Sequence, residues 1–399
     1  MKGKWKSESL GKVAQVFNGK TPSKSEKKQN GYPVLKIKDI SADGFFRGKF
    51  ESFVDTAFAD KFSDKKVKKG DTLILNAAHN AEYVASKTYF AETPTFESLA
   101  TGEWLIVRPD ADYSYPSYIH HWINFQPTRQ SIQELVNGIH LYPKDIARLS
   151  VPLPPLPEQK RIAAILDAAD AIRVQRKAAI AKLDELARSV FLEMFGDPVR
   201  NEKGWEQMSL NEEILFLTSG SRGWAKYHAE QGSAFIKIQN VKESRLDFST
   251  VQYVRPPETQ ETKRTKVQED DLLVSITADL GRTAVVDRAT AERGAYINQH
   301  LALVRLKQKR LLPLFTSVFL ESPAGEKQFA AMNQSAVKAG LNFDSIKRLS
   351  IIAPEISLQQ QFIHRINGIN SLKLYHRSAL AREEALFASL QHRAFAGEL

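Results

Sequence analysis

Cysteine is absent from the 399 residues of this chain. Its absence excludes a disulfide framework, zinc sites built on thiolates and cysteine nucleophiles. Long apolar runs are absent as well, since no stretch approaches the ~18 residues that a membrane-spanning helix needs. The basic start at Met1–Lys6 is not followed by an apolar segment, so we do not expect a secretory signal. These absences favour the reducing cytoplasm as the compartment in which the chain acts.

Motifs of several enzyme classes are missing too. We find no Walker loop for ATP, no Gly-rich methyltransferase cofactor loop and no motif for a flipped base, because Pro154–Pro155 lacks a preceding acid or amide. The carboxylates Asp270–Asp271 open a predicted strand and are expected to form a solvated turn. His79 and His120–His121 lack partners at the spacing of metal ligands. We therefore expect no catalytic residue, no cofactor and no metal.

Charge is unbalanced, because 56 Lys and Arg against 46 Asp and Glu give a formal net charge of +10. A basic chain is attracted to polyanions, of which nucleic acid is the usual one. Hydrophobic residues make up 42% of the chain, enough for the cores of two domains of ordinary size. Composition thus permits DNA binding without demonstrating it.

An internal repeat organises the chain. Leu35–Ile40 is followed about 200 residues later by the similar Ile236–Val241, and Ile146–Ser150 is followed at the same offset by Ile346–Ser350. Each repeat begins with short apolar runs broken by Gly, Pro, Asn and Asp, which predict strands and loops. Each then ends in a long helix rich in Ala, Leu, Lys, Arg and Glu. We predict two similar globular domains at 1–156 and 205–356, a spacer helix with its linker at 157–204, and a C-terminal spacer helix at 357–399.

Apolar residues in the two predicted helices alternate at three and four, which is the spacing of a coiled-coil seam. The predicted seam consists of Ile162, Ile165, Ile172, Arg176, Leu183, Leu186, Val190, Phe362, Ile366, Ile369, Leu372, His376, Leu386 and Leu390. Its polar members, Arg176 and His376, occupy equivalent positions. They either reach solvent at the edge of the seam or form a polar layer that fixes register and antiparallel orientation.

These patterns predict an α+β protein in which two mixed α/β domains are joined by two long helices. The helices pair as an antiparallel coiled coil, with a pseudo-twofold internal repeat. A helix of ~38 residues at ~1.5 Å per residue is about 57 Å long, which is commensurate with one to two turns of duplex DNA. Gly368 is the one weak helix former in the second helix, and the sequence leaves open whether it causes a kink.

Several segments resemble the specificity subunits of type I restriction–modification systems over essentially the whole chain. The most specific is the junction Pro154–Ile162, and the others are Phe191–Pro198, Lys203–Trp205, Gly19–Lys24, Gly70–Ile74, Gly220–Tyr227, Ile276–Thr283 and Asn298–Leu301. Two positions depart from the family pattern. Lys20 stands where a second Gly is common, and Ser357–Gln361 lacks the Glu-Gln pair of the first junction.

The resemblance implies that each domain is a target-recognition domain that reads one half of a split sequence in double-stranded DNA. It implies that the helix pair spaces the two halves and that methyltransferase subunits, two in number, grip the helices and domains. Nuclease and translocase subunits would join that core. Adenine methylation, S-adenosylmethionine use, ATP hydrolysis and cleavage would then belong to the partners.

Phosphate contacts and base contacts use different side chains. In the first domain we expect phosphate contacts from Lys20, Thr21, Lys24, Lys27 and Lys28. The amide-rich loop after the strand that ends at Leu75 suits base reading, with Asn76, His79, Asn80, Tyr83 and Lys87 as candidates. A solvated lysine run and ordinary turn chemistry are the alternative interpretations.

In the second domain the DNA-binding candidates are Arg222, Trp224, Lys226, Tyr227, Thr277, Arg282, Asn298, Gln299, His300, Lys338 and Asn342. They combine cationic, aromatic, amide and imidazole groups. Alternatively, Trp224 belongs to the core and the polar run at 298–300 satisfies buried backbone.

Two other classes of protein remain open at this point. An enzyme, such as a fused methyltransferase or nuclease, would bind S-adenosylmethionine as a lone chain or show clustered carboxylates. A coiled-coil scaffold with protein-binding domains would show no sequence-specific DNA binding even with its partners present.

Overall fold

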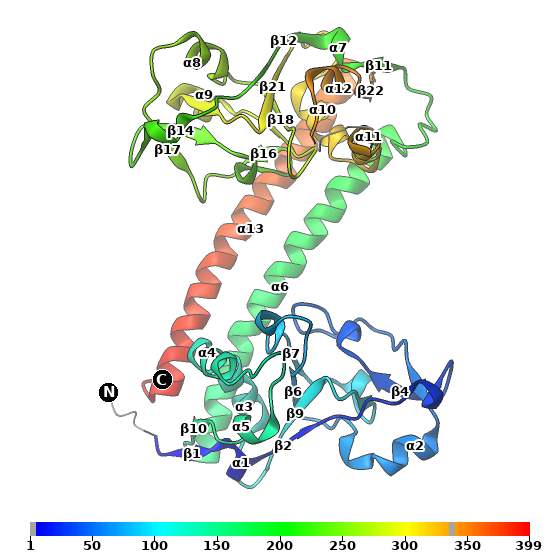
Figure 1. Cartoon of the computed structure of the whole chain (residues 1–399), viewed down its shortest axis with the longest axis vertical. Helices are drawn as coiled ribbons and strands as arrows, with labels where there is room; N and C mark the ends of the chain where they lie inside the picture. Colours follow the sequence, from blue (N-terminus) through cyan, green and yellow to red (C-terminus); the bar gives the residue numbers. More distant parts are fainter. Residues whose placement is uncertain (1–4, 335–339) are drawn as a thin grey trace. The chain divides into compact units, whose positions relative to one another are not determined.

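The computed structural model describes residues 5–334 and 340–399. The chain forms two compact units, of which unit 1 comprises Met1–Ala178 and His376–Leu399 and unit 2 comprises Ala179–Tyr375. Each unit contains one globular region and a segment of each long helix, α6 (Leu156–Phe195) and α13 (Ile356–Ala396) (Figure 1). Within the described residues, no helix has the length and hydropathy needed to cross a membrane.

Unit 1 is built on two four-stranded sheets. The first is antiparallel, in the order β2 (Ala14–Asn18), β9 (Trp104–Pro109), β6 (Thr72–Leu75), β7 (Thr88–Phe90). The second has the order β3 (Lys27–Lys28), β5 (Phe53–Val54), β4 (Tyr32–Leu35), β8 (Leu99–Ala100), and β1 (Ser7–Ser9) pairs separately with β10 (Ser150–Pro152). The short helices are α1 (Leu10–Val13), α2 (Thr56–Lys61), α3 (Pro116–Ile123), α4 (Gln126–Glu134) and α5 (Pro143–Ile146).

Unit 2 repeats this plan. Its sheets have the orders β12 (Ile214–Ser219), β21 (Leu301–Leu306), β18 (Leu272–Ser275), β19 (Thr283–Val285) and β13 (His228–Ala229), β17 (Gln252–Val254), β14 (Ser233–Ile236), β20 (Ala295–Ile297). The two-stranded pairs are β11 (Gln207–Ser209) with β22 (Ser350–Ile352) and β15 (Val241–Lys242) with β16 (Arg245–Leu246). The short helices are α7 (Leu210–Glu213), α8 (Gln260–Thr265), α9 (Arg288–Arg293), α10 (Pro313–Leu320), α11 (Pro323–Gln334) and α12 (Phe343–Lys347). The same strand order in both units confirms the predicted internal repeat.

Each unit fixes the start of its long helix with a fully buried glutamine. In unit 1 the side-chain oxygen of Gln159 accepts from the amide of Tyr115 (2.8 Å), and its nitrogen donates to the carbonyls of Tyr113 (3.0 Å) and Pro154 (2.9 Å). In unit 2 Gln359 makes the same three bonds, to the Leu312 amide and to the carbonyls of Arg310 and Pro354. The second junction therefore departs from the first at Leu358, not at its glutamine.

The two long helices run antiparallel within each unit. In unit 1 the beginning of α6 lies beside the end of α13, where the guanidinium of Arg161 donates to the carbonyl of Leu399 (2.7 Å). In unit 2 the end of α6 lies beside the beginning of α13, where Arg365 pairs with Glu193 (3.4 Å). Both helix ends enter the core of the unit, because Ile162 packs in one cluster with Phe395, and Phe195 packs with Phe362. Helix α13 continues through Gly368 without interruption.

The residues between the helices differ in part from those predicted. In unit 1 the buried or half-buried row is Ile162, Leu166, Ala169, Arg173, Arg176, His376, Leu380, Glu383, Phe387, Leu390 and Ala394. In unit 2 it is Ile180, Leu183, Ala187, Val190, Met194, Phe362, Ile366, Ile369 and Lys373. Four residues predicted for the seam are instead exposed, namely Ile172, Leu186, Leu372 and Leu386.

The observed seam differs from the predicted one because each helix carries two neighbouring rows of residues at heptad spacing, one buried and one exposed. Each of the four exposed residues directly precedes a seam position, and two of those seam positions are the basic residues Arg173 and Lys373. Apolar periodicity in the sequence therefore predicts residues of the exposed row as part of the seam. Arg176 and His376 do meet, since the guanidinium of Arg176 donates to Nδ1 of His376 (2.9 Å) and pairs with Glu383 (2.7 Å). This contact is the polar-layer arrangement rather than two side chains reaching solvent separately.

Candidate nucleic-acid interface

In each unit, most of the candidate DNA-binding segments meet at one edge of the first sheet. Strands β2 and β6 both run antiparallel to β9, so they end at the same edge, where β9 begins. The loop with Lys20 follows β2 and the loop at 76–83 follows β6. The side-chain nitrogen of Asn76 joins them by donating to Asn18 Oδ1 (3.0 Å) and to the carbonyl of Gly102 (3.0 Å). We call this the recognition edge of unit 1.

Unit 2 has an equivalent recognition edge. Strands β12 and β18 both run antiparallel to β21, so the loops at 220–223 and 276–282 emerge beside the segment 298–300 that precedes β21. Glycine is required where each first loop leaves its strand. A Cβ at Gly19 would lie 2.3 Å from the Thr101 carbonyl oxygen, and one at Gly220 would lie 2.0 Å from that of Asn298. The close approach packs the first loop of each edge against the segment that precedes β9 or β21.

The candidate DNA-binding residues of unit 1 divide into exposed side chains and side chains that stabilise the recognition edge. Lys24, Lys27, His79, Asn80 and Tyr83 are exposed, and Tyr83 is 63% exposed despite its large ring. Other exposed candidates already have protein partners. Lys20 lies over the ring of Phe62, Lys28 pairs with Asp55 (3.3 Å) and Thr21 accepts from the amide of Gly102 (2.9 Å).

Two of the candidate DNA-binding residues of unit 1, Asn76 and Lys87, make hydrogen bonds within the protein. Asn76 is 4% exposed and makes the edge contacts described above. The ammonium of Lys87 donates to the carbonyls of Ile37 (3.1 Å) and Ile40 (2.8 Å). Burial, together with the nearby charge of Arg47, lowers the pKa of Lys87. These two side chains stabilise the recognition edge rather than extend from it.

In unit 2 the structure places Trp224 in the core. It is 3% exposed, stacks on Phe235 with ring centroids 5.6 Å apart, and donates from its indole nitrogen to Glu261 (3.1 Å). This position corrects the expectation that it contacts DNA, because a buried ring cannot meet a base without unfolding its surroundings. Arg222 and Lys226, on either side of it, are exposed, while Tyr227 is half-buried.

The remaining candidates of unit 2 form a hydrogen-bonded group at the edge. Thr277 Oγ1 lies 2.7 Å from Nδ1 of His300, whose other ring nitrogen lies 3.3 Å from the amide nitrogen of Gln299. Asn298 is nearly buried and accepts from the amide of His300 (3.2 Å). These contacts fit the alternative in which the 298–300 run satisfies backbone, although Gln299 and His300 stay half-exposed.

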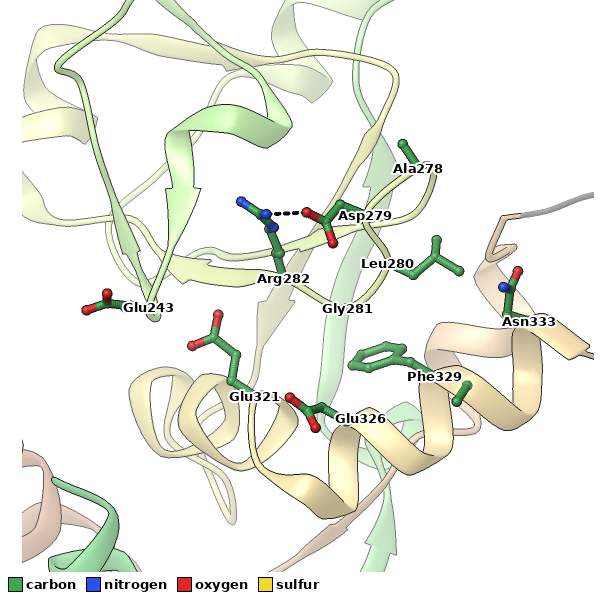
Figure 2. Close-up of a pocket in the computed structure, with 11 residues that line it drawn as sticks. Glu243, Ala278, Asp279, Leu280, Gly281, Arg282, Glu321, Glu326, Phe329 and Asn333 are labelled. Carbon is green, nitrogen blue, oxygen red and sulfur yellow. Dashed lines mark ion pairs between the residues drawn. The ribbon is translucent and has the colours of Figure 1, made fainter. Parts of the chain in front are cut away.

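Arg282 lies at the mouth of a surface hollow beside the unit 2 edge (Figure 2). Its guanidinium forms an ion pair with Asp279, and its side chain is 42% exposed. Asn342 caps α12 by accepting from the amide of Ser345 (2.8 Å). Lys338 lies outside the residues that the structure describes.

Several side chains that position these loops were not indicated by any sequence pattern. Arg129 of α4 donates to the carbonyls of Ala85 (2.7 Å) and Ser86 (3.1 Å), and Gln133 donates to that of Ala81 (3.0 Å). In unit 2 the partly exposed Arg264 donates to the carbonyl of Ser219 (2.7 Å) at the end of β12. It therefore adds a cation to that edge. Among the described residues, no group of three or more His, Asp or Glu side chains is arranged to hold a metal ion.

This arrangement defines a class of protein, a duplicated α+β chain with loops of polar and cationic residues at one sheet edge in each unit. The type I restriction modification DNA specificity domain matches residues 2–183. The StySPI specificity subunit of a type I restriction enzyme from Salmonella potsdam is 22% identical over 426 residues, covering 99% of this chain and 89% of that protein. The EcoKI specificity subunit from Escherichia coli K12 is 23% identical, covering 90% and 82%.

Solved structures agree on the fold. A crystal structure of the type I restriction–modification S subunit from M. genitalium has a TM-score of 0.62 at 12% identity, covering 99% of this chain and 96% of that one. A chain from a study of complex assembly and conformational transition of the type I system has a TM-score of 0.50 at 15% identity, covering 100% and 99%. Residues 2–183 thus match the type I restriction modification DNA specificity domain, and the chain is similar over nearly its whole length to specificity subunits of type I restriction enzymes.

Proposed function

We propose that the chain reads the two halves of a split DNA target, one with segment 1–156 and the other with segment 205–356, and that the helix pair sets their spacing. The observation that carries this proposal is the repeated recognition edge. The two edges share strand order and a glycine at the same place, yet they present different side chains. One edge carries His79, Asn80 and Tyr83, and the other carries Arg222, Thr277 and Arg282. Two domains with the same strand order and different loop side chains are suited to reading two different half-sequences.

The exposed side chains divide by their chemistry. Lys24 and Lys27 in unit 1, and Lys226 and Arg264 in unit 2, are exposed and suit phosphate contacts that set position and register. Asn80 and Arg282 suit base edges in the major groove, because an amide pairs with adenine and a guanidinium with guanine. The ion pair between Arg282 and Asp279 must break before Arg282 can contact a base, so Asp279 competes with DNA for the guanidinium.

The four exposed apolar residues of the helices support a docking surface for the methyltransferase subunit. In unit 2, Leu186 and Leu372 each lie one heptad from the Glu193–Arg365 ion pair, so they lie on the same flank as that pair and at one level with each other. In unit 1, Ile172 and Leu386 each precede a member of the Arg173–Phe387 contact. On the opposite flank, Lys177 pairs with Glu384 (3.6 Å). In unit 1 the exposed apolar pair therefore lies on the flank opposite the Lys177–Glu384 ion pair.

These apolar pairs also bear on stoichiometry. The repeat relates Ile172 to Leu372 and Leu186 to Leu386, so each unit offers the same apolar pair. Two equivalent surfaces fit two copies of one partner. We accordingly propose that two methyltransferase subunits bind the helix pair and that the complex acts in the cytoplasm.

Selection from a random duplex pool tests the proposed function. The complex of this chain with its methyltransferase subunit is expected to enrich duplexes with two short sequences separated by an unspecified spacer of fixed length. Asn80→Ala is expected to relax one half only, and Arg282→Ala the other half only, by ~1–3 kcal/mol per base contact. Lys27→Ala, as a control, is expected to weaken both equally and to reduce the salt dependence. Enrichment of a single continuous sequence, or of none, would contradict the proposal.

A further inference from the structure

Lys373 is a charged side chain in the seam of the helix pair, and it is only 8% exposed. Its ammonium pairs with Asp184 of α6 and with Glu243 of the turn between β15 and β16, the latter at 2.6 Å. A buried ammonium is unfavourable unless it is paired and hydrogen-bonded. One side chain of α13 therefore joins the other long helix to the globular region of unit 2.

The turn that receives Lys373 is narrow and held on both sides. Glu243 and Ser244 have φ of 51° and 60°, and two successive left-handed residues form the tight turn that suits a hairpin. Toward the sheet, the hydroxyl of Ser244 donates to Glu321 (2.9 Å), and its carbonyl accepts from the amide of Val285 (3.1 Å). Toward the helices, Glu243 meets Lys373. The turn is thus a fixed link between two parts of unit 2.

The same link reaches the recognition edge. Glu321 accepts from the amide of Thr283 (3.1 Å), which directly follows Arg282. Figure 2 shows Glu243, Glu321 and Arg282 around one hollow, with Arg282 paired to Asp279. A continuous series of polar contacts therefore runs from the helix pair to the loop that we propose reads DNA.

Unit 1 has different chemistry at the equivalent positions. Arg173, the counterpart of Lys373, lies 4.3 Å from the ring centre of Phe387 and pairs with Asp170 of its own helix (2.7 Å). Ala42 occupies the place of Glu243 and has no carboxylate to offer. The link between Lys373 and Glu243 is therefore a feature of the second domain, not a consequence of the duplicated scaffold.

We infer that Lys373, acting through Glu243, is a positioning residue that fixes the second recognition domain on its segment of the helix pair and so restricts the spacer length that the protein accepts. The inference rests on the proposed reading of a split target. One added base pair moves a half-site by about 3.4 Å along the duplex and turns it by about 35°. A domain held at a fixed angle rejects that displacement, whereas a domain that can rock on its helices tolerates it.

Methylation of synthetic duplexes by the whole complex tests the inference. The duplexes carry both half-sites at the native spacing and at spacings one base pair shorter and longer. Glu243→Asn removes the link on the domain side, and Asn tolerates the positive φ of this position. It is expected to raise methylation at the wrong spacings, relative to the native one, by about tenfold. Lys177→Met, which alters only a contact between the two helices, is expected to keep the native preference.

A second variant separates positioning from folding. Lys373→Met removes the link from the helix side and is expected to relax the spacing as Glu243→Asn does, with both half-site sequences unchanged. The inference is overturned if Glu243→Asn keeps the native preference, or if Lys177→Met relaxes it equally. It would also be overturned if the variants lost methylation on every duplex and the melting temperature of the complex fell. The link between Lys373 and Glu243 would then serve folding alone. A wild-type complex without any preferred spacing would instead refute the proposed function.

Discussion

Asp167 shows how a single carboxylate in α6 connects a long helix to the first domain. It accepts from the hydroxyl of Ser117 (2.6 Å) and from the imidazole of His121 (2.7 Å), both in α3. Burial alone would raise the pKa of Asp167, but the bonds from His121 and Ser117 together hold that pKa below its ordinary value. The neighbouring His120 stays neutral, since burial and the nearby His121 lower its pKa to about 3. Unit 1 is thus fixed to its helices by a hydrogen-bonded pair, where unit 2 uses a buried lysine.

A lowered pKa makes this contact sensitive to acid. Because the pKa of Asp167 is lower in the folded chain than in the unfolded chain, its contribution to stability is present above the ordinary value of 3.8 and is lost as the pH falls below it. Asp167→Asn is therefore expected to reduce the dependence of the melting temperature on pH in that acidic range. Thermal unfolding followed from neutral pH downward measures the effect. An unchanged acid slope in the variant would show that Asp167 does not contribute.

At the scale of elements, the glutamine that begins each long helix is the clearest repeated device. Gln359 satisfies one amide and two carbonyls while fully buried, so Gln359→Leu leaves three backbone groups without partners. The substitution is expected to lower the free energy of unfolding by about 3 kcal/mol. Gln360→Leu is a matched control, because the adjacent side chain is exposed and its loss is expected to change stability by less than ~0.5 kcal/mol. Equal effects in chemical denaturation would argue against the role assigned to Gln359.

The absence of native cysteine allows a direct test of helix register. In the chain with Ile172→Cys and Leu386→Cys, a short bismaleimide is expected to join the two helices, because these exposed residues lie at one level of the antiparallel pair. Ile172→Cys with Leu372→Cys is the control, because these residues would meet only if the helices ran parallel at the offset of the repeat. Cross-linking in the control pair and not in the first pair would contradict the antiparallel register.

The sequence predicted the elements better than the contacts between them. Both long helices were predicted to begin within one residue of their observed starts, because a long run of good helix formers follows each junction. The seam was partly mispredicted, since hydrophobic pattern cannot show that Arg173 and Lys373 occupy seam positions through ion pairs and ring contacts. Trp224 was likewise ambiguous, because an aromatic residue beside Arg and Lys suits both a DNA surface and a core. Its burial depends on Phe235 and Glu261, which are distant in sequence.

At the scale of the whole molecule, duplication explains why one chain can have two recognition edges with the same scaffold. The loops differ while the strand order, the edge glycines and the helix-starting glutamines repeat. Other contacts between each domain and the helices are not repeated, since Asp167 serves unit 1 and Lys373 serves unit 2. The scaffold is therefore the same in the two copies, and the side chains that we propose set sequence and spacing differ between them.

The most direct test of this account is the methylome of cells that express the partner methyltransferase subunit with and without this chain. The account predicts a split motif, two short sequences around an unspecified spacer of one length, methylated only when the chain is present. Replacing segment 205–356 with that of a relative is expected to change one half of the motif and keep the other. No new methylation despite a stable complex of the chain with its partner subunit, or a motif that changes in both halves when one segment is replaced, would contradict the central claim.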